Sequence, residues 1–428
     1  MRKLLFSIAF AALAAVSGTA RAGVADEAVR KEIAGIDVII LRTNVKDVVT
    51  LAGSLPAGDD RSPRENVAIA TLTGSMLDKG TTKQDKFAIA QKLGDAGAAL
   101  GFGVDSNSLQ ISGKSLRKDL PMVMSLLAEQ LRTPAFSEEE FGKLKKLLAG
   151  AVRRQQEDTD ARADEAFLRA IYPEGHPNRQ PSAEELLAAI DKASLEEIRR
   201  FHSQYYGPSG MRLVLVGDID PAAAQAEIRK AFSGWNGGSP RPEAPKAGPV
   251  AGPREVTVFM PDKTNVSVLW GQPTQLAYSH PDTIPLRIGS RILGSGGFTS
   301  RLMATVRDRE GLTYGIASYV SNDTFTDGDW RIWANFAPEL LDKGLASTRR
   351  EVLAWRDKGI TQAELERTKT EFTGTFKVGL STTSGMAGTM AFTAAATSTE
   401  LRSTRPTAAG CRFCAFSARS TPSRPAWP

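Results

Sequence analysis

The sequence predicts an α+β protein of two similar domains, each a mainly antiparallel sheet packed with helices. Three observations support this prediction. Both halves of the 428-residue chain carry strands, glycine-terminated helices and a long helix in the same order. A glycine- and proline-rich stretch at residues 234–253 separates the halves. Finally, 41% apolar and 24% charged residues describe an ordinary globular protein, long enough for two cores.

The first half begins with two short apolar strands at residues 35–42 and 48–55, followed by a turn-rich stretch. Apolar spacing and glycine stops then predict two helices, a pair of strands and a third helix, at residues 66–77, 83–93, 98–104, 108–113 and 120–130. This order gives the first domain both a sheet and the helices to cover it.

Capping boxes mark the helices that follow. Ser137 and Glu140 have the spacing of a capping box, which predicts a long charged helix that continues to about Ile171. A turn-rich loop, YPEGHPNRQP, comes next. A second box, Ser194 with Glu197, opens a helix that precedes the buried-type strand at residues 211–216.

The second half repeats this plan after the linker. It has predicted strands at residues 255–260, 266–271 and 329–336 and a helix at about 282–293. A third capping box, Thr361 with Glu364, opens a late helix. We therefore expect an N-terminal domain, a linker and a C-terminal domain at residues 23–233, 234–254 and 255–392.

The N-terminus has the features of a secretory signal peptide. Arg2 and Lys3 precede an apolar run too short to span a bilayer, and Ala20-Arg21-Ala22 forms an A-x-A cleavage site. Residues 1–22 are therefore expected to be removed near Ala22, which predicts a periplasmic or secreted protein. The alternative is a retained N-terminal anchor. No later run approaches membrane-spanning length, so no membrane span is expected in the mature chain.

The C-terminal stretch, residues 393–428, differs from the rest of the chain. Of its 36 residues, 28 are Ala, Ser, Thr, Arg or Pro, without periodicity. The composition indicates a frame-shifted or otherwise altered terminus; the alternative is a natural disordered tail. Its C-x-x-C pair, Cys411 and Cys414, lacks a second pair or a nearby histidine and is interpreted as incidental.

The charge of the chain excludes one class of partner. The formal charge of +6 comes from the signal and tail regions, and the remaining body is close to neutral. A neutral body does not have the basic surface that nucleic-acid binding requires, so no nucleic-acid partner is expected.

Few residues can support catalysis by this chain alone. The three histidines, His176, His202 and His280, are far apart in sequence, which excludes a helical zinc pair such as H-E-x-x-H. We expect a surface hydrogen bond for His176, a packing role for His202 and a turn position for His280. There is no G-x-S-x-G nucleophile motif.

The most informative stretch is residues 294–319, GSGGFTSRLMATVRDREGLTYGIASY. A glycine turn with Gly296 and Gly297, a short helix, a stop at Gly311 and a strand place Arg307 near Tyr314. A guanidinium and a phenol on two rigid elements can together bind a carbonyl or a carboxylate. The alternative is an exposed arginine beside a half-buried tyrosine. A phosphate loop is disfavoured because the motif has no lysine.

Three stretches resemble the pitrilysin/insulinase family of zinc metallopeptidases, in its two-domain, processing-peptidase-like subgroup. They are MLDKGT at residues 76–81, the long segment from HPNRQP to FHSQYYGPSGMRLVLVGDID, and residues 294–319 with an arginine and a tyrosine seven positions apart. The resemblance covers about residues 36–392. It implies that the two domains form half of a clamshell chamber that two such chains enclose.

The sequence departs from the family at its metal site. Aligned on residues 76–81, the family's H-x-x-E-H positions fall on Thr71, Gly74 and Ser75, and its third ligand, a glutamate, falls near Val152. Hydroxyl, hydrogen and isopropyl groups cannot replace two imidazoles and two carboxylates around zinc. We therefore expect this chain to bind no metal.

The resemblance then implies a function. Some family enzymes are heterodimers in which one subunit carries zinc and the other keeps only the arginine–tyrosine pair. This chain resembles the second kind. Arg307, Tyr314, Gly296 and Gly297 are its expected substrate-binding residues, with zinc and the catalytic base on a homologous partner and an unfolded peptide as substrate. The alternatives are a non-enzymatic peptide-binding or assembly protein and, less favoured, a stand-alone hydrolase.

Overall fold

The N-terminal domain is a six-stranded sheet covered by helices on one face. The computed structural model describes residues 27–243, 245–248 and 252–397. The strand order is β1-β2-β6-β3-β5-β4, with only β2 and β6 parallel among these pairs. The strands are β1 Val29–Ile33, β2 Ile36–Arg42, β3 Val48–Leu55, β4 Ala99–Val104, β5 Leu109–Leu116 and β6 Arg212–Gly217.

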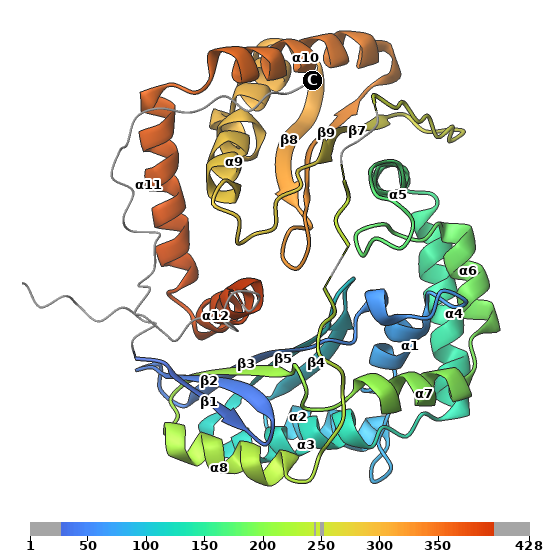
Figure 1. Ribbon diagram of the computed structural model, residues 1–428, viewed down its shortest axis with the longest axis vertical. Helices are drawn as coiled ribbons and strands as arrows, with labels where there is room; N and C mark the ends of the chain where they lie inside the picture. Colours follow the sequence, from blue (N-terminus) through green and yellow to red (C-terminus); the bar gives the residue numbers. More distant parts are fainter. Residues whose placement is uncertain (1–26, 244, 249–251, 398–428) are drawn as a thin grey trace, which may run out of the picture.

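Helices of this domain lie below and beside the sheet in Figure 1. They are α1 Ile69–Ser75, α2 Lys86–Asp95, α3 Leu120–Arg132, α4 Glu138–Gln155, α5 Thr159–Ile171, α6 Ala183–Lys192, α7 Leu195–Tyr205 and α8 Pro221–Phe232. One apolar core joins this sheet to α1, α3, α4, α6, α7 and α8.

The C-terminal domain has a smaller, antiparallel sheet with the order β7-β9-β8. Its elements are β7 Val266–Pro273, α9 Thr283–Ser290, the π-helical turns η3 Arg291–Ser295 and η5 Met303–Arg309, β8 Thr313–Ser321, β9 Asp329–Phe336, α10 Leu341–Lys358, α11 Gln362–Gly379 and α12 Thr383–Thr397. When α9 and the directly following η3 are counted as one helix, these elements follow the same order as β3, α1, α2, β4, β5, α3, α4 and α5 of the N-terminal domain. The chain is therefore an α+β protein of two similar domains.

The two domains exchange one helix each. Helix α12 lies on the open face of the N-terminal sheet, where Ala387 and Ala394 pack against Ile39 and Val214. Helix α5 packs in turn against β7 of the C-terminal sheet. The Thr383 and Thr50 hydroxyls are 2.8 Å apart beneath α12. Each sheet thus buries apolar surface under a helix from the other half of the chain.

A buried ionic network joins the domains beside α5. Asp329, whose side chain is fully buried, accepts from Arg331 (2.5 Å) and from the Tyr172 hydroxyl (3.0 Å). Arg331 also pairs with Asp164 of α5. In the same junction the Asn178 side chain donates to two backbone carbonyls of the β8–β9 turn. Loop 172–181 is therefore an inter-domain contact.

Some sequence predictions require correction. The long helix expected to reach Ile171 is two helices, because the Asp158 side chain caps α5 by accepting from Asp160 and Ala161. The Ser137–Glu140 capping box does not form. Instead, Glu140 pairs with two lysines of α2 and α4, Lys86 and Lys143, at 2.7 and 2.9 Å.

Other elements also differ from expectation. Residues 255–260, predicted as a strand, belong to no strand, and β1 was not predicted. The capping boxes at Ser194 and Thr361 are confirmed. The first residues of the atypical tail complete α12, where Ala394 is buried. The predicted signal peptide and residues 398–428 lie outside the described residues.

The described helices give no membrane span. None of them combines the length and the apolar composition needed to cross a bilayer.

Replacing Arg331 by Met should strongly destabilise the protein. Asp329 would be left as a buried carboxylate without its cation, which costs about 3–5 kcal/mol of unfolding free energy. The matched control is Arg350→Met, because Arg350 forms an exposed pair with Glu310 that is worth about 1 kcal/mol or less. Denaturant unfolding measures both. Equal effects of the two substitutions would contradict the account of the network.

Candidate functional site

Arg307 and Tyr314 lie side by side at one end of the C-terminal sheet. The Arg307 guanidinium carbon is 5.4 Å from the centre of the Tyr314 ring and 4.7 Å from that of Phe298. Contacts of this kind hold a guanidinium in place and leave most of its N–H donors for another acceptor. Tyr314 is 88% exposed. The sequence did not indicate Phe298, whose exposed ring completes the cluster.

The backbone around Tyr314 explains its exposure. Gly311 ends the preceding turn with a φ of +64°, which confirms the predicted glycine stop. The register of β8 against β9 shifts between Thr313 and Gly315, so that Tyr314 has no partner residue on β9. A β-bulge of this kind re-aims the side chain of the extra residue. The exposed phenol is thus a consequence of the strand geometry.

The glycine turn before η5 has its own structural reasons. Gly297 has a φ of +62°, which favours glycine. A Cβ on Gly296 would lie 2.8 Å from the Arg291 carbonyl oxygen. These constraints position the neighbouring Phe298. The expected role of both glycines in substrate approach stays a prediction.

The positions expected for zinc ligands lie in the other domain, on the packed helices α1 and α4. The Thr71 hydroxyl donates to Asp59 at 2.8 Å. Val152 is 6% exposed within the apolar core. Among the described residues, no group of three His, Cys, Asp or Glu side chains is placed to hold a metal ion. The donor set at Thr71, Gly74, Ser75 and Val152 does not fit zinc.

Gly74 also lacks the space for a ligand side chain. A Cβ at this position would lie 2.3 Å from a methyl carbon of Val104 and 3.0 Å from Leu109. The neighbouring strands β4 and β5 therefore fill the space that a glutamate would need. Helix α1 is therefore closely packed against the sheet at Gly74.

An acidic cluster that the sequence reasoning missed lies beside Thr71. Burial among neighbouring atoms raises the pKa of Asp59 to about 6, while the Thr71 hydrogen bond opposes the shift and Asp105 adds to it. Asp59 is nevertheless exposed at the surface, so solvent screens much of this effect. Burial also raises the pKa of Asp60, which lies 3.9 Å from Arg241. In the sequence, only the adjacent residues Asp59 and Asp60 in a turn-rich stretch could have indicated this cluster.

His176 does not make the surface hydrogen bond that the sequence predicts. It is 3% exposed, stacks on Tyr172 with 4.4 Å between ring centres, and has Nε2 3.5 Å from Asp327. Burial lowers the pKa of His176, and Asp327 opposes this shift. His202 packs against Phe136, as expected. His176 is therefore part of the domain junction.

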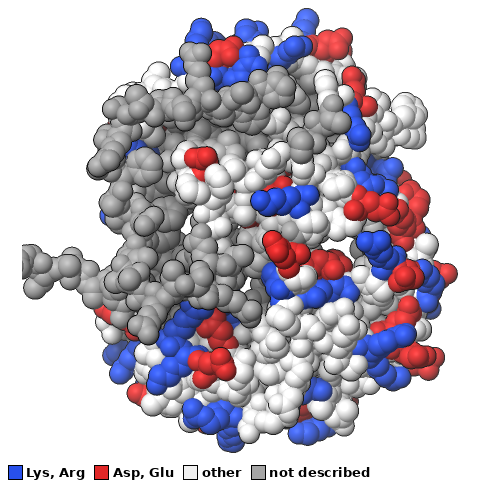
Figure 2. Space-filling model, viewed as in Figure 1, with Lys and Arg blue, Asp and Glu red and all other residues white. Residues whose placement is uncertain are grey.

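A second feature of the junction is a groove of about 430 Å³ between α5 and the C-terminal sheet. Its lining combines acidic, basic and aromatic side chains: Asp160, Asp164, Leu269, Tyr319, Arg331 and Trp333. Asp160 is already bonded to Ser267, Trp333 and Asn335. Figure 2 shows acidic and basic side chains interspersed over the visible surface near the junction.

This fold and these sites define a two-domain, peptidase-like protein whose N-terminal domain lacks the ligands for a catalytic metal. Comparisons with known proteins identify the family. Residues 38–181 match the model of the insulinase family, peptidase family M16, and residues 192–372 match that of the peptidase M16 inactive domain. The chain belongs to peptidase family M16 and is a homologue of the inactive type.

Relatives and solved structures support this placement. An uncharacterized zinc protease of Streptomyces coelicolor is 24% identical over 76% of this chain and 71% of its own. The non-peptidase homolog YmxG of Helicobacter pylori is 23% identical over 73% and 71%. A crystal structure of a peptidase M16 inactive domain from Pseudomonas fluorescens has a TM-score of 0.76 at 22% identity and covers 85% of this chain and 86% of that one.

Replacing Gly74 by Ala should destabilise the protein by about 1–3 kcal/mol, because the methyl group overpacks the contact with β4. The control is Gly94→Ala in α2, where an added Cβ meets nothing within 4 Å. That change should stabilise by about 0.5–1 kcal/mol through the higher helix propensity of alanine. Thermal unfolding measures both variants. A neutral or stabilising Gly74→Ala would contradict the packing account.

Asp59 should make stability depend on pH. Its pKa in the folded protein is about 6, above the ordinary 3.8. A raised carboxyl pKa stabilises the fold at pH values below the ordinary pKa, and this contribution is lost as pH rises through the folded value. Asp59→Asn should therefore be more stable than the wild type at pH 7.5, by about 1 kcal/mol or less after solvent screening, with no comparable gain at pH 4.

Thermal unfolding between pH 4 and pH 8 tests this prediction. Asp191→Asn, at an exposed position of α6, serves as the matched control. A gain for Asp59→Asn that does not vary with pH would contradict the raised pKa.

Proposed function

We propose that this protein is the non-zinc-binding subunit of a heterodimeric periplasmic metallopeptidase. Arg307 and Tyr314 would contribute substrate binding and transition-state support, and a homologous zinc-carrying partner would hydrolyse the peptide. The observation that carries the proposal is the contrast between the two domains. Arg307 lies against the exposed ring of Tyr314, whereas the positions of the zinc motif hold no suitable ligand.

The chemistry of the pair fits peptide binding. The Tyr314 hydroxyl can donate a hydrogen bond to a substrate carbonyl or to the oxyanion that develops from it. Arg307, held over Phe298, can donate to a neighbouring backbone carbonyl of the same peptide. Tyr314 lies on β8, an edge strand of the described C-terminal sheet. An extended peptide can add to such an edge through main-chain hydrogen bonds.

Two further expectations belong to this proposal. Residues 1–22 would direct the chain to the periplasm and would be removed near Ala22. Zinc would be bound by the partner alone. The match to an inactive-domain model and the relative named as a non-peptidase homolog support a subunit without its own catalytic metal.

The second candidate function is a non-enzymatic peptide-binding or assembly protein. The close packing around Gly74 favours it, because the N-terminal domain has adapted to the absence of ligands. This alternative predicts peptide binding by the isolated chain and no gain of hydrolysis in any pairing.

The experiment combines the chain with a zinc-motif subunit of the same family, ideally encoded by the adjacent gene, and measures the cleavage of an unfolded peptide. Tyr314→Phe should lower kcat by about 10²-fold, the scale of losing one oxyanion donor. Arg307→Ala should lower kcat/KM, mainly through a higher KM. Neither substitution should change the thermal stability of the protein appreciably.

The control substitutions are Arg309→Ala, in the same π-helical turn, and Tyr205→Phe, in the N-terminal domain. Both should leave cleavage unchanged. Full activity of the partner alone, indifferent to Arg307→Ala and Tyr314→Phe, would contradict the proposal. Metal analysis of the isolated chain provides a further check, since one tightly bound zinc would also oppose it.

A further inference from the structure

Phe298 lies on a turn whose backbone is fixed by local hydrogen bonds. The turn, η4 Gly297–Thr299, connects η3 to the segment that enters η5. The Ser300 hydroxyl is buried and donates to the Gly297 carbonyl oxygen at 2.8 Å. Phe298 itself is 65% exposed. Burial in a core therefore does not explain why a large aromatic side chain stands at this position.

The nearby Arg307 guanidinium has few polar partners. Its one hydrogen bond within the described structure runs from Nη1 to Oδ1 of the adjacent Asp308, at a long 3.3 Å. Arg301 differs, because it donates two bonds of 2.7 Å to Glu364 and a third to the Gly359 carbonyl. A guanidinium has five N–H donors. Most of those of Arg307 are therefore available to a ligand.

Aromatic rings do more than hydrogen bonds to set the position of this guanidinium. Its carbon is 4.7 Å from the centre of the Phe298 ring and 5.4 Å from that of Tyr314, within the range of a cation–π contact. The Arg307 side chain is only 26% exposed, although both rings are largely exposed. The Phe298 contact is the shorter one, and its ring has no hydroxyl with which to contact a substrate.

Without the Phe298 ring, a competing partner would gain influence over Arg307. The carboxylate of Asp308 already pairs with the guanidinium, and a shorter charge-assisted hydrogen bond would be stronger. A free arginine side chain also has high rotamer freedom, which it loses when it binds a ligand. Loss of the ring would therefore leave Arg307 more mobile and more often paired with Asp308, so that a peptide carbonyl would bind less well.

We propose that Phe298 is a positioning residue, which holds the Arg307 guanidinium ready for a peptide carbonyl and limits its pairing with Asp308. This inference rests on the proposed function, in which Arg307 donates to the peptide backbone, and adds a residue to that site. The ring acts through its π face, so the position requires an aromatic side chain and not only an apolar one. Phe298 acts through Arg307 and not by contact with the substrate.

The first test uses the isolated full chain with isotope-labelled arginine. The heteronuclear NOE of the Arg307 Nε–Hε group, assigned by its loss in Arg307→Lys, reports the fast motion of the guanidinium. It should fall in Phe298→Ala and in Phe298→Leu, and it should stay close to the wild-type value in Phe298→Tyr, which keeps a ring. An unchanged NOE in Phe298→Ala would overturn the proposal, whether or not the chain supports peptide cleavage.

The second test measures peptide cleavage by the chain together with a zinc-motif subunit. Phe298→Ala and Phe298→Leu should raise KM about two- to fivefold, the scale of one exposed cation–π contact, with little change in kcat. Phe298→Tyr should keep the wild-type KM. In an Arg307→Ala background, Phe298→Ala should have no further effect. Adding Asp308→Asn to Phe298→Ala should recover part of the loss, which a purely structural role of the ring would not allow.

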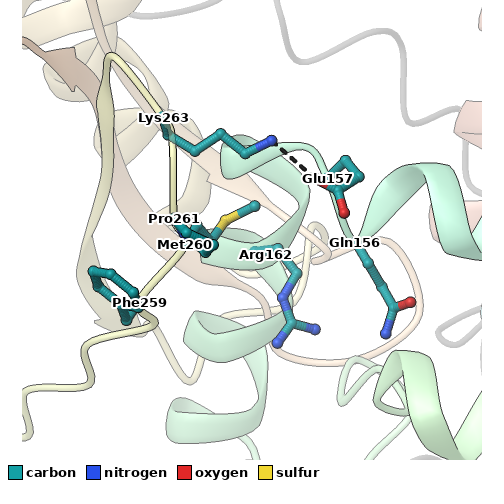
Figure 3. A pocket seen from close by; sticks show the side chains of 7 residues that line it. All are labelled: Gln156, Glu157, Arg162, Phe259, Met260, Pro261 and Lys263. Carbon is teal, nitrogen blue, oxygen red and sulfur yellow. Dashed lines mark hydrogen bonds and ion pairs between the residues drawn. The ribbon is translucent and has the colours of Figure 1, made fainter.

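The matched control is Phe259→Ala, which removes another exposed ring. Phe259 is 86% exposed. Figure 3 shows it among the residues that line a cavity of about 190 Å³ beside the α4–α5 turn, together with Glu157 and Lys263. The substitution changes a comparable exposed side chain in another part of the molecule, so neither KM nor the Arg307 NOE should change.

The outcomes separate this inference from the proposed function. If Arg307→Ala raises KM but Phe298→Ala does not, or if Phe298→Leu behaves as the wild type, the subunit proposal stands and the positioning role is overturned. If the chain adds nothing to cleavage by its partner, the subunit proposal fails, and the Arg307 NOE alone decides whether Phe298 positions the guanidinium. Circular dichroism should show that the Phe298 variants remain folded, because the side chain is mostly exposed.

Discussion

The mutual exchange of one helix between the domains is the constraint on which the rest of the structure depends. Helix α12 closes the open face of the N-terminal sheet, and α5 packs on the C-terminal sheet. The face beneath α12 would otherwise expose apolar surface to water, and the face beneath α5 is held mainly by polar contacts. Because each helix is tied to its own domain by the chain, the exchange fixes the two sheets relative to each other. The buried pairing of Asp329, Arg331 and Tyr172 then specifies the junction.

Although the two domains have similar folds, they differ in the residues at their candidate functional sites. In the N-terminal domain, Gly74 is closely packed against β4 and Val152 lies in the apolar core, at positions where zinc ligands were expected. In the C-terminal domain, a β-bulge exposes Tyr314, and two aromatic rings hold Arg307. This contrast is the basis of the proposal that the chain binds a peptide backbone and relies on a second chain for the zinc that activates water.

Much of the fold and part of the site could be predicted from the sequence. Periodicity and glycine stops located most strands and helices, and spacing placed Arg307 near Tyr314. The missed features depend on tertiary contacts. Asp158 caps α5 as a separate helix, which packs against the other domain. His176 is buried because the β8–β9 turn covers its loop. Phe298 and Asp59 gained significance only through residues distant in sequence.

The central claim is that this chain supplies substrate-binding groups to a zinc-carrying partner. The most direct measurement is the rate of peptide cleavage at a fixed partner concentration while this chain is added. The account predicts a saturable rise that levels off at a one-to-one ratio, with a zinc content that follows the partner alone. A cleavage rate that does not change over the titration would contradict it.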